Sequence, residues 1–325
     1  MTSPRAEGGS PALTGKPSPL RMLWITAALA ACFLGIKWGL RDAPLLWFAA
    51  LRALLGGGAL ALVALFQRRQ IPSSFTAWAK ITALGLVNVT FAFAAMFAGV
   101  AGLSTGVAAV LANAQPLLIL LPAWWLFGER ITARTGLALG TGFAGLLIVS
   151  IPAGGGSGAL LSLAAVTAGT LMVRGLADLD VVVLSAAHFL IGGLVLAGVA
   201  LTVEGPPAIS WTPRFVIVLA FLGLVATAAT TLAWFVEAQR SRLSSLTVWM
   251  FLIPVFGLLI GIVVLGERPT AWTGAGIALV LASMWEALTK QPFPHAGPPG
   301  HLNSPGPDYS PPAAKRAGPR GTTRR

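Results

Sequence analysis

Charged side chains are scarce in this chain. Asp, Glu, Lys and Arg make up 10% of the 325 residues, whereas about 25% is usual in a soluble domain. Hydrophobic residues account for 56%, and the mean hydropathy is +0.81. A soluble fold of this length cannot bury so much apolar surface, so the composition predicts a polytopic membrane protein.

Cysteine and acidic residues are also few. The single cysteine, Cys32, excludes a disulfide framework, and His295 and His301 lie in a polar tail without partner ligands. We therefore expect no metal site and no cofactor. The net charge is +12, but the basic residues lie in tails and short connections rather than on a soluble basic face. Nucleic acid is therefore not an expected partner; the expected partners are the lipid bilayer and a small-molecule substrate.

Long apolar segments fill the chain between two polar tails. The tails, residues 1–20 and 290–325, are rich in Pro and Gly, and we predict that both are disordered. A helix that crosses a bilayer needs about 20 apolar residues. Ten segments meet this requirement: 21–40, 45–66, 76–99, 102–127, 133–151, 158–175, 181–202, 214–237, 243–265 and 270–289. The sequence therefore predicts an all-α fold with ten transmembrane helices.

Lys and Arg set the orientation of these helices. An even number of spans places both tails on one side, together with Arg68 and Arg69 among many other basic residues. The other side receives Arg41, Arg214 and Arg268. By the positive-inside rule, we expect both termini to be cytoplasmic, in a plasma or inner cell membrane.

One block of sequence occurs twice in the chain. Pro116 is followed by Gly128, Glu129 and Arg130, and at the same spacing Pro254 is followed by Gly266, Glu267 and Arg268. We interpret the two Gly-Glu-Arg segments as structural turns, in which Gly ends a helix in a left-handed conformation. We expect each proline to kink its helix, because it removes a backbone hydrogen bond.

A weaker match extends the duplication to the second and seventh spans. Residues 48–57 (FAALRALLGG) resemble residues 184–193 (LSAAHFLIGG), an alignment that places Arg52 opposite His188. Each copy holds five spans, an odd number, so the second copy must enter the membrane from the opposite face. Two inverted five-helix repeats, residues 21–151 and 152–289, are therefore predicted, as in secondary transporters.

These paired Pro…Gly-Glu-Arg blocks, with Lys37 and Arg52 in the first two spans, resemble the EamA-type branch of the drug/metabolite transporter superfamily. The resemblance covers roughly residues 21–289. It implies ten helices in two inverted repeats and the transport of small organic solutes, commonly outward. In one respect the chain departs from the family, which often has a Trp-Gly pair early in the first helix where this chain has Ala30, Ala31 and Cys32.

Ionisable groups inside a bilayer usually have a partner or line a watery cavity. Lys37 and Arg52 either form a cationic patch that binds an anionic or zwitterionic solute, or Lys37 reaches the headgroups and Arg52 pairs with a carbonyl or Asp42. His188 is either a proton-responsive group or a neutral side chain bonded to a neighbouring helix. For Glu237 we expect a local pair with Arg240.

Polar and aromatic residues at mid-span complete the candidate substrate path. They either face the solute or bond between helices as packing contacts. The candidates are Lys37, Arg52, Asn88, Asn113, Gln115, His188, Thr230 and Trp249.

The predicted function is a secondary transporter that works by alternating access, with outward transport as the expected direction. Two alternatives stay open: a channel-like permease, and an intramembrane serine hydrolase built on Ser157 and His188. No phosphate-binding Gly-x-x-x-x-Gly-Lys-Ser/Thr loop occurs, which argues against ATP-driven export by this chain alone. The GxxxG motifs do not decide whether the protein forms a homodimer.

Overall fold

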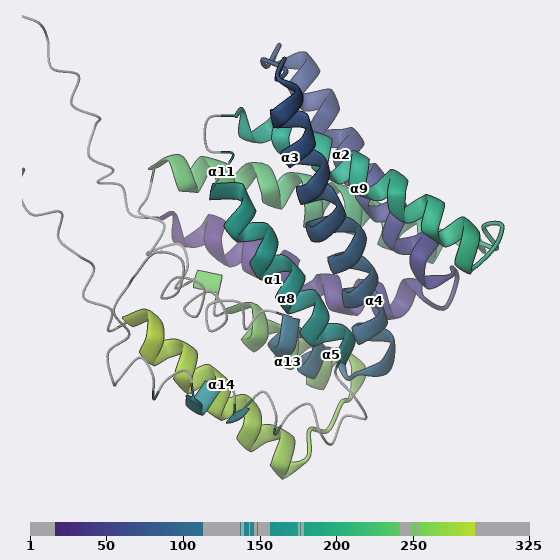
Figure 1. The fold of residues 1–325 in the computed structure, drawn as a ribbon. Helices are drawn as coiled ribbons and strands as arrows, with labels where there is room; N and C mark the ends of the chain where they lie inside the picture. Colours follow the sequence, from purple (N-terminus) through teal and green to yellow (C-terminus); the bar gives the residue numbers. More distant parts are fainter. Residues whose placement is uncertain are drawn as a thin grey trace, which may run out of the picture. The chain divides into compact units, whose positions relative to one another are not determined.

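A computed structural model describes residues 17–112, 137, 140–142, 144–145, 148, 157–174, 176, 179–240, 249–250 and 252–289. All regular secondary structure in these residues is helical (Figure 1). The elements are α1 (Pro19–Gly39), α2 (Leu45–Phe66), α3 (Phe75–Gly85), η1 (Leu86–Phe91), α4 (Ala92–Gly102), α5 (Thr105–Ala112), α8 (Ser157–Arg174), α9 (Val181–Val203), α10 (Pro213–Ala220), η2 (Phe221–Ala229), α11 (Thr230–Arg240), α13 (Leu252–Leu265) and α14 (Ala271–Thr289).

Five of the described helices are long and apolar enough to cross a membrane. Each has a mean hydropathy between 1.7 and 2.4 over its best window, and several large apolar side chains face outward, among them Leu194 at 63% exposure. An outer surface of this kind is compatible with lipid rather than with water. The five spans are Pro19–Gly39, Leu45–Phe66, Phe75–Gly102, Val181–Val203 and Pro213–Trp234. The prediction of an all-α polytopic membrane protein is confirmed.

Two of these spans contain a π-helical segment at corresponding positions. The segment η1 interrupts the span Phe75–Gly102, and η2 interrupts the span Pro213–Trp234. The offset that carries Pro116 onto Pro254 also carries Leu86–Phe91 onto residues 224–229, which lie inside η2. A π-helical turn is rare and widens the helix, and it occurs most often at functional sites.

The most extensive helix pair in the described part of the chain joins the two halves through α2 and α9, which lie side by side in Figure 1. Gly57 contacts Phe189 and Leu190, while Gly193 contacts Ala53 and Leu54. Moving backward along α2 therefore moves the contact forward along α9, so the two helices are antiparallel. When residues 48–57 are aligned with 184–193, the two contacts are the same contact with the partners exchanged, which is the arrangement expected around a pseudo-two-fold axis.

A second pair of glycine contacts follows the same symmetry. A Cβ on Gly56 would lie 2.6 Å from Cγ2 of Thr227 and 3.1 Å from the carbonyl oxygen of Gly223. In the other half, a Cβ on Gly192 would meet the carbonyl oxygen of Gly85 and lie 2.6 Å from Cβ of Val89. Each half thus inserts a glycine of its second helix against the π-helical span of the other half, a close approach that a larger residue would block.

Polar links join the two halves at the end of the bundle where α1 terminates, here named the Lys37 end. Nζ of Lys37 lies 3.1 Å from Oε1 of Glu267. Arg214 donates to both carboxylate oxygens of Asp42, at 2.8 to 3.0 Å. The carboxylate of Glu204 accepts from the first backbone N–H groups of α2, those of Leu46 and Trp47, at 2.8 and 3.1 Å, which favours this helix terminus electrostatically.

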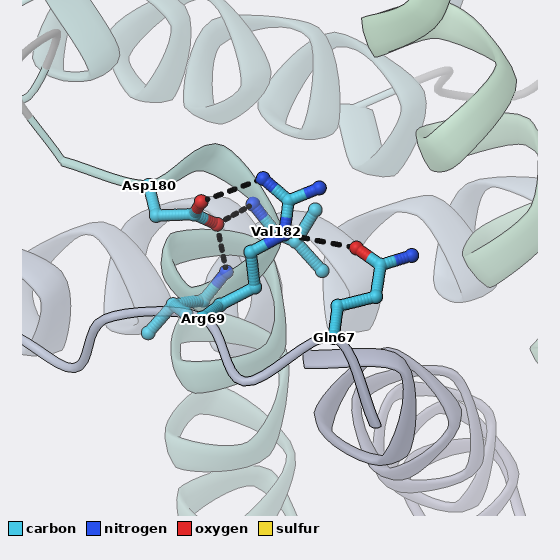
Figure 2. Close-up of polar contacts among 5 residues, drawn as sticks. Gln67, Arg69, Asp180 and Val182 are labelled. Carbon is cyan, nitrogen blue, oxygen red and sulfur yellow. Dashed lines mark hydrogen bonds and ion pairs between the residues drawn. The ribbon is translucent and has the colours of Figure 1, made fainter. Parts of the chain in front are cut away.

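Other links join the halves at the opposite end, here named the Arg21 end. Glu237 accepts from Arg21 and from the backbone N–H of Ser18. Figure 2 shows Asp180 accepting from Arg69 at 3.1 Å and also capping α9 through backbone N–H groups. Asp180 is the counterpart of Asp42 at the offset of the duplicated block, so an aspartate just before the second helix of each half pairs with an arginine of the other half. The two pairs lie at opposite ends of the bundle.

These contacts bear on two expectations from the sequence. Glu237 pairs with the distant residue Arg21; the side chain of Arg240 lies outside the described residues, so the expected local pair stays a prediction. Asp42 pairs with Arg214, so it is not the partner of Arg52. In both cases the partner belongs to the other half of the chain, which local spacing cannot indicate.

Candidate functional site

A cavity of about 340 Å³ lies between the two halves. Its lining comes from α1, α2, α9 and both π-interrupted spans. Val181, the first residue of α9, and Trp234 place one part of the lining toward the Arg21 end, whereas Arg52 lies about 10 Å along α2 from the Lys37 end. The cavity volume falls in the range of small-molecule sites.

Aromatic rings pack together between Arg52 and the Lys37 end of the bundle. Phe48 contacts Phe97 and Phe215 with ring centroids 5.2 Å apart in each pair, and all three rings are fully buried. Gly39 at the end of α1 lies directly against Phe48. Among the described residues, this aromatic cluster and the polar links of the Lys37 end therefore lie between the cavity and that face.

Arg52 is the charged residue of the cavity. It is 5% exposed, its Nε donates to Oγ1 of Thr227 at 3.2 Å, and its guanidinium carbon lies 4.6 Å from the ring centre of Phe93. The hydroxyl of Thr227 in turn donates to the carbonyl oxygen of Leu222. Nη1 is buried and has no hydrogen-bond partner among the described residues, which costs about 1–3 kcal/mol relative to a satisfied donor.

His188 lines the same cavity from α9. Its Nδ1 lies 2.8 Å from the carbonyl oxygen of Leu184, and its ring stacks on that of Phe189 with centroids 4.4 Å apart. A carbonyl oxygen only accepts, so Nδ1 carries a proton and Nε2 is the second, variable position. Arg52 and His188 are counterparts in the duplication, and the structure brings them to one cavity.

Asn88 and Thr230 also line the cavity, on opposite halves. The side chain of Asn88 packs against Gly169 of α8, where a Cβ would lie 2.6 Å from its Oδ1. The hydroxyl of Thr230 donates to the carbonyl oxygen of Thr227 at 3.2 Å and satisfies its own helix. Four of the sequence candidates therefore meet at one site: Arg52, Asn88, His188 and Thr230.

Two other candidates lie elsewhere. Lys37 pairs with Glu267 beside a separate pocket of about 320 Å³ at the Lys37 end. Trp249 packs with Met22 and Ile25 next to the cavity, and its neighbour Met250 is the residue that lines it. Lys37 and Arg52 therefore do not form the expected cationic patch. Lys37 is in an ion pair with Glu267, and Arg52 lines the cavity.

The turn and kink residues are described only in the second copy. Gly266 follows α13 with a φ of 64°, the left-handed conformation that glycine favours. Glu267 faces Lys37, and Arg268 is exposed. Pro254 is buried in α13, and the expected kink at this residue stays a prediction. The remaining candidates and turn residues lie outside the described residues: Asn113, Gln115, Pro116, Gly128, Glu129 and Arg130.

The aromatic wall of the site was not predicted from the sequence. Phe93, Phe189 and Trp234 line the cavity, and Phe93 supports the guanidinium of Arg52. Aromatic residues are common along apolar spans, so nothing in the sequence distinguishes these three from lipid-facing ones. The repeat match did carry one signal, since Phe189 follows His188 within it.

The helices, the two corresponding halves and the cavity between them define a polytopic membrane protein built from a duplicated unit. The family model described as "EamA-like transporter family" matches residues 20–151 and again residues 155–288. The chain therefore belongs to the EamA-like transporter family, within the drug/metabolite transporter superfamily, and is a transporter of that type.

Relatives with similar sequences support this assignment. The chain is 28% identical over 280 residues to the "Uncharacterized transporter YvbV" of Bacillus subtilis, covering 81% of this chain and 92% of that protein. It is 27% identical over 254 residues to the "WAT1-related protein At3g02690, chloroplastic" of Arabidopsis thaliana, covering 73% of this chain and 61% of that protein. These matches indicate a transporter rather than an enzyme.

A solved structure shares the fold. The structure named "Crystal structure of protein" superposes with a TM-score of 0.60 at 17% identity, covering 82% of this chain and 95% of that chain. Identity this low indicates a common fold and carries no information about substrate.

Proposed function

We propose that this protein is a secondary transporter that exports small organic solutes by alternating access. The observation that carries the proposal is the cavity between the halves. The corresponding residues Arg52 and His188 both line it. A site on the symmetry axis of two inverted repeats can be exposed to either face when the repeats exchange conformations.

The asymmetry of the two ends assigns this conformation to one state of the proposed cycle. The cavity extends toward the Arg21 end, while the Lys37 end is closed by Phe48, Phe97 and Phe215 and by the links of Lys37 and Asp42. In our proposal the Arg21 end is cytoplasmic, so this conformation loads solute from the cytoplasm. Opening the Lys37 end would then release the solute outward.

Cysteine accessibility tests the orientation. Cys32 is the only cysteine and is buried, so Cys32→Ala provides a cysteine-free background. Ser210→Cys at the Lys37 end and Ser73→Cys at the Arg21 end place single thiols at exposed positions. We expect a membrane-impermeant maleimide to label Ser210→Cys in intact cells and Ser73→Cys only after permeabilisation. The reverse pattern would invert the proposed orientation.

Counterflow in proteoliposomes tests the carrier mechanism. Vesicles loaded with unlabelled amino acid, nucleoside or amphipathic cation should accumulate the labelled form transiently and saturably if the protein exchanges that solute. Ser185→Phe should abolish the exchange, because Ser185 is 3% exposed and a phenyl ring there would fill the cavity that it lines. Ser73→Phe, at an exposed site outside the cavity, is the matched control.

The alternatives predict different results. A channel-like permease would give flux that rises linearly with concentration and is not stimulated by solute on the opposite side. An intramembrane serine hydrolase would require a reactive Ser157, which is the first residue of α8, to label with a fluorophosphonate. Absence of saturable exchange for every solute, or exchange unaffected by Ser185→Phe, would contradict the carrier.

A further inference from the structure

Arg52 presents a charge problem that the described protein does not solve by itself. A buried guanidinium normally has a carboxylate or several acceptors, because charge is costly away from water. Here Nε bonds to a threonine hydroxyl, one face of the guanidinium lies on Phe93, and Nη1 has no partner among the described residues. Cys32 lies beside the group, but a thiol is only a weak acceptor and cannot balance the charge.

The described lining of the cavity offers no counterion. Its polar side chains are Asn88, Ser185, His188 and three threonines, and none of these carries a carboxylate. The acidic residues nearest in the chain are used at the ends of the bundle, for example Asp42 with Arg214 and Glu237 with Arg21. A cation held in this way is ready to accept an anion from outside the protein.

The remainder of the lining is apolar and aromatic. Ile25, Leu29 and Leu84 line one part, while Phe93, Phe189 and Trp234 supply rings. Such a wall favours a hydrocarbon or aromatic body, because burying apolar surface is favourable and polar groups of a solute would lose hydration there. The volume of about 340 Å³ limits this body to a small molecule.

We propose that the cavity selects small amphipathic carboxylates, with the carboxylate ion-paired to Arg52 and the apolar body against the aromatic wall. Guanidinium and carboxylate match in geometry and form charge-assisted hydrogen bonds. Thr227 and Phe93 act as positioning residues, since one fixes Nε and the other supports the planar face. This inference rests on the proposed carrier function and specifies its substrate class.

Ligands that share one body and differ in the head group test this selectivity. The purified protein in detergent would be titrated with 3-phenylpropanoate, 3-phenylpropanamide and 3-phenylpropylamine, with hexanoate, hexanamide and hexylamine as an aliphatic series. Affinities follow from the concentration dependence of the melting temperature. We expect each carboxylate to bind at least about tenfold more tightly than its amide, and each amine to bind most weakly.

Substitution of Arg52 should remove the preference and nothing else. In Arg52→Gln, we expect carboxylate affinity to fall about 10- to 100-fold, to the level of the amide, while amide affinity stays within about threefold of the wild type. Arg52→Lys should retain part of the preference, because it keeps the charge but loses the planar fork. Arg69→Gln removes a cation outside the cavity and is the control.

Several outcomes would overturn the proposal: amides or amines that bind as tightly as carboxylates, a preference that survives in Arg52→Gln, or an equal loss for all head groups. Failure of both carboxylates to bind in the millimolar range would overturn it as well. Saturable, trans-stimulated counterflow of a neutral or cationic solute would then leave the carrier function standing without the anion selectivity. Absence of any exchange would remove the carrier function itself.

Discussion

Single residues of the same type have different roles in this protein according to depth. Lys37 and Arg214 lie near the ends of the bundle and pair with Glu267 and Asp42, whereas Arg52 lies inside and lines the cavity. Ion pairs close to water contribute about 0–1 kcal/mol, while a buried arginine such as Arg52, which has no carboxylate partner among the described residues, carries a larger cost that a ligand can relieve. The depth of a cation therefore indicates whether it links helices or binds solute.

Asp42 makes acid stability testable. The hydrogen bonds from Arg214 hold the pKa of Asp42 below its usual range. A depressed pKa means that the folded protein gains stability from ionised Asp42 above the unfolded value and loses it as pH falls through the folded value. We expect the melting temperature to fall across this acidic range less steeply in Asp42→Asn than in the wild type.

Arg214→Gln provides the check on this prediction. It should reproduce the pH dependence of Asp42→Asn, and the double variant should add little to either single variant, because both remove the same pair. Parallel acid profiles for Asp42→Asn and the wild type would show that this pair does not contribute to acid stability.

At the scale of elements, close glycine contacts determine how the two halves meet. Gly56 against η2 and Gly192 against the end of α3 allow the helices to approach until backbone atoms touch. The π-helical segments lie at these crossings and carry Asn88 and Thr227 to the cavity. The symmetric contacts thus position the lining of the site from both sides.

Alanine substitutions at these crossings should separate packing from helix propensity. Gly56→Ala and Gly192→Ala each place a Cβ about 2.6 Å from a neighbouring carbon, and overpacking of this kind costs about 1–3 kcal/mol. Gly58 and Gly198 lie on the same two helices with nothing within 4 Å of an added Cβ, so their alanine variants should gain about 0.5–1 kcal/mol from helix propensity.

Melting temperatures of the four purified variants measure this contrast. The expected order places Gly58→Ala and Gly198→Ala at or above the wild type, and Gly56→Ala and Gly192→Ala below it. Equal effects within each helix would mean that the crossings tolerate a methyl group and do not position the site.

At the scale of the whole molecule, the links of the Lys37 end would oppose the opening that the proposed export cycle requires. The pair of Lys37 and Glu267 joins the first span to the turn after α13, 230 residues further along the chain. Val107 lines the same pocket as Glu267 and is 5% exposed. A thiol at this position therefore reports on opening at the Lys37 end.

We predict that Lys37→Met accelerates maleimide labelling of Val107→Cys by about two- to fivefold in the Cys32→Ala background. The lysine is partly exposed, so the pair contributes at most about 1 kcal/mol to the closed state, and this factor is the corresponding change in population. Lys80→Met, which removes an exposed cation at the opposite end, should leave the rate unchanged. An unchanged labelling rate in Lys37→Met would show that the ion pair does not stabilise the closed state of the Lys37 end.

The amino-acid sequence by itself determined the membrane class, the positions of the five described spans and the correspondence of Arg52 with His188. These features depend on local composition and on repetition, which need no knowledge of neighbours in space. Only the tertiary structure decided which cations are paired and which is available: Lys37 faces Glu267, Arg21 faces Glu237, and Arg52 lines the cavity. Such partners lie far apart in the chain, and packing between helices, including the glycine crossings, selects among combinations that sequence spacing leaves equally possible.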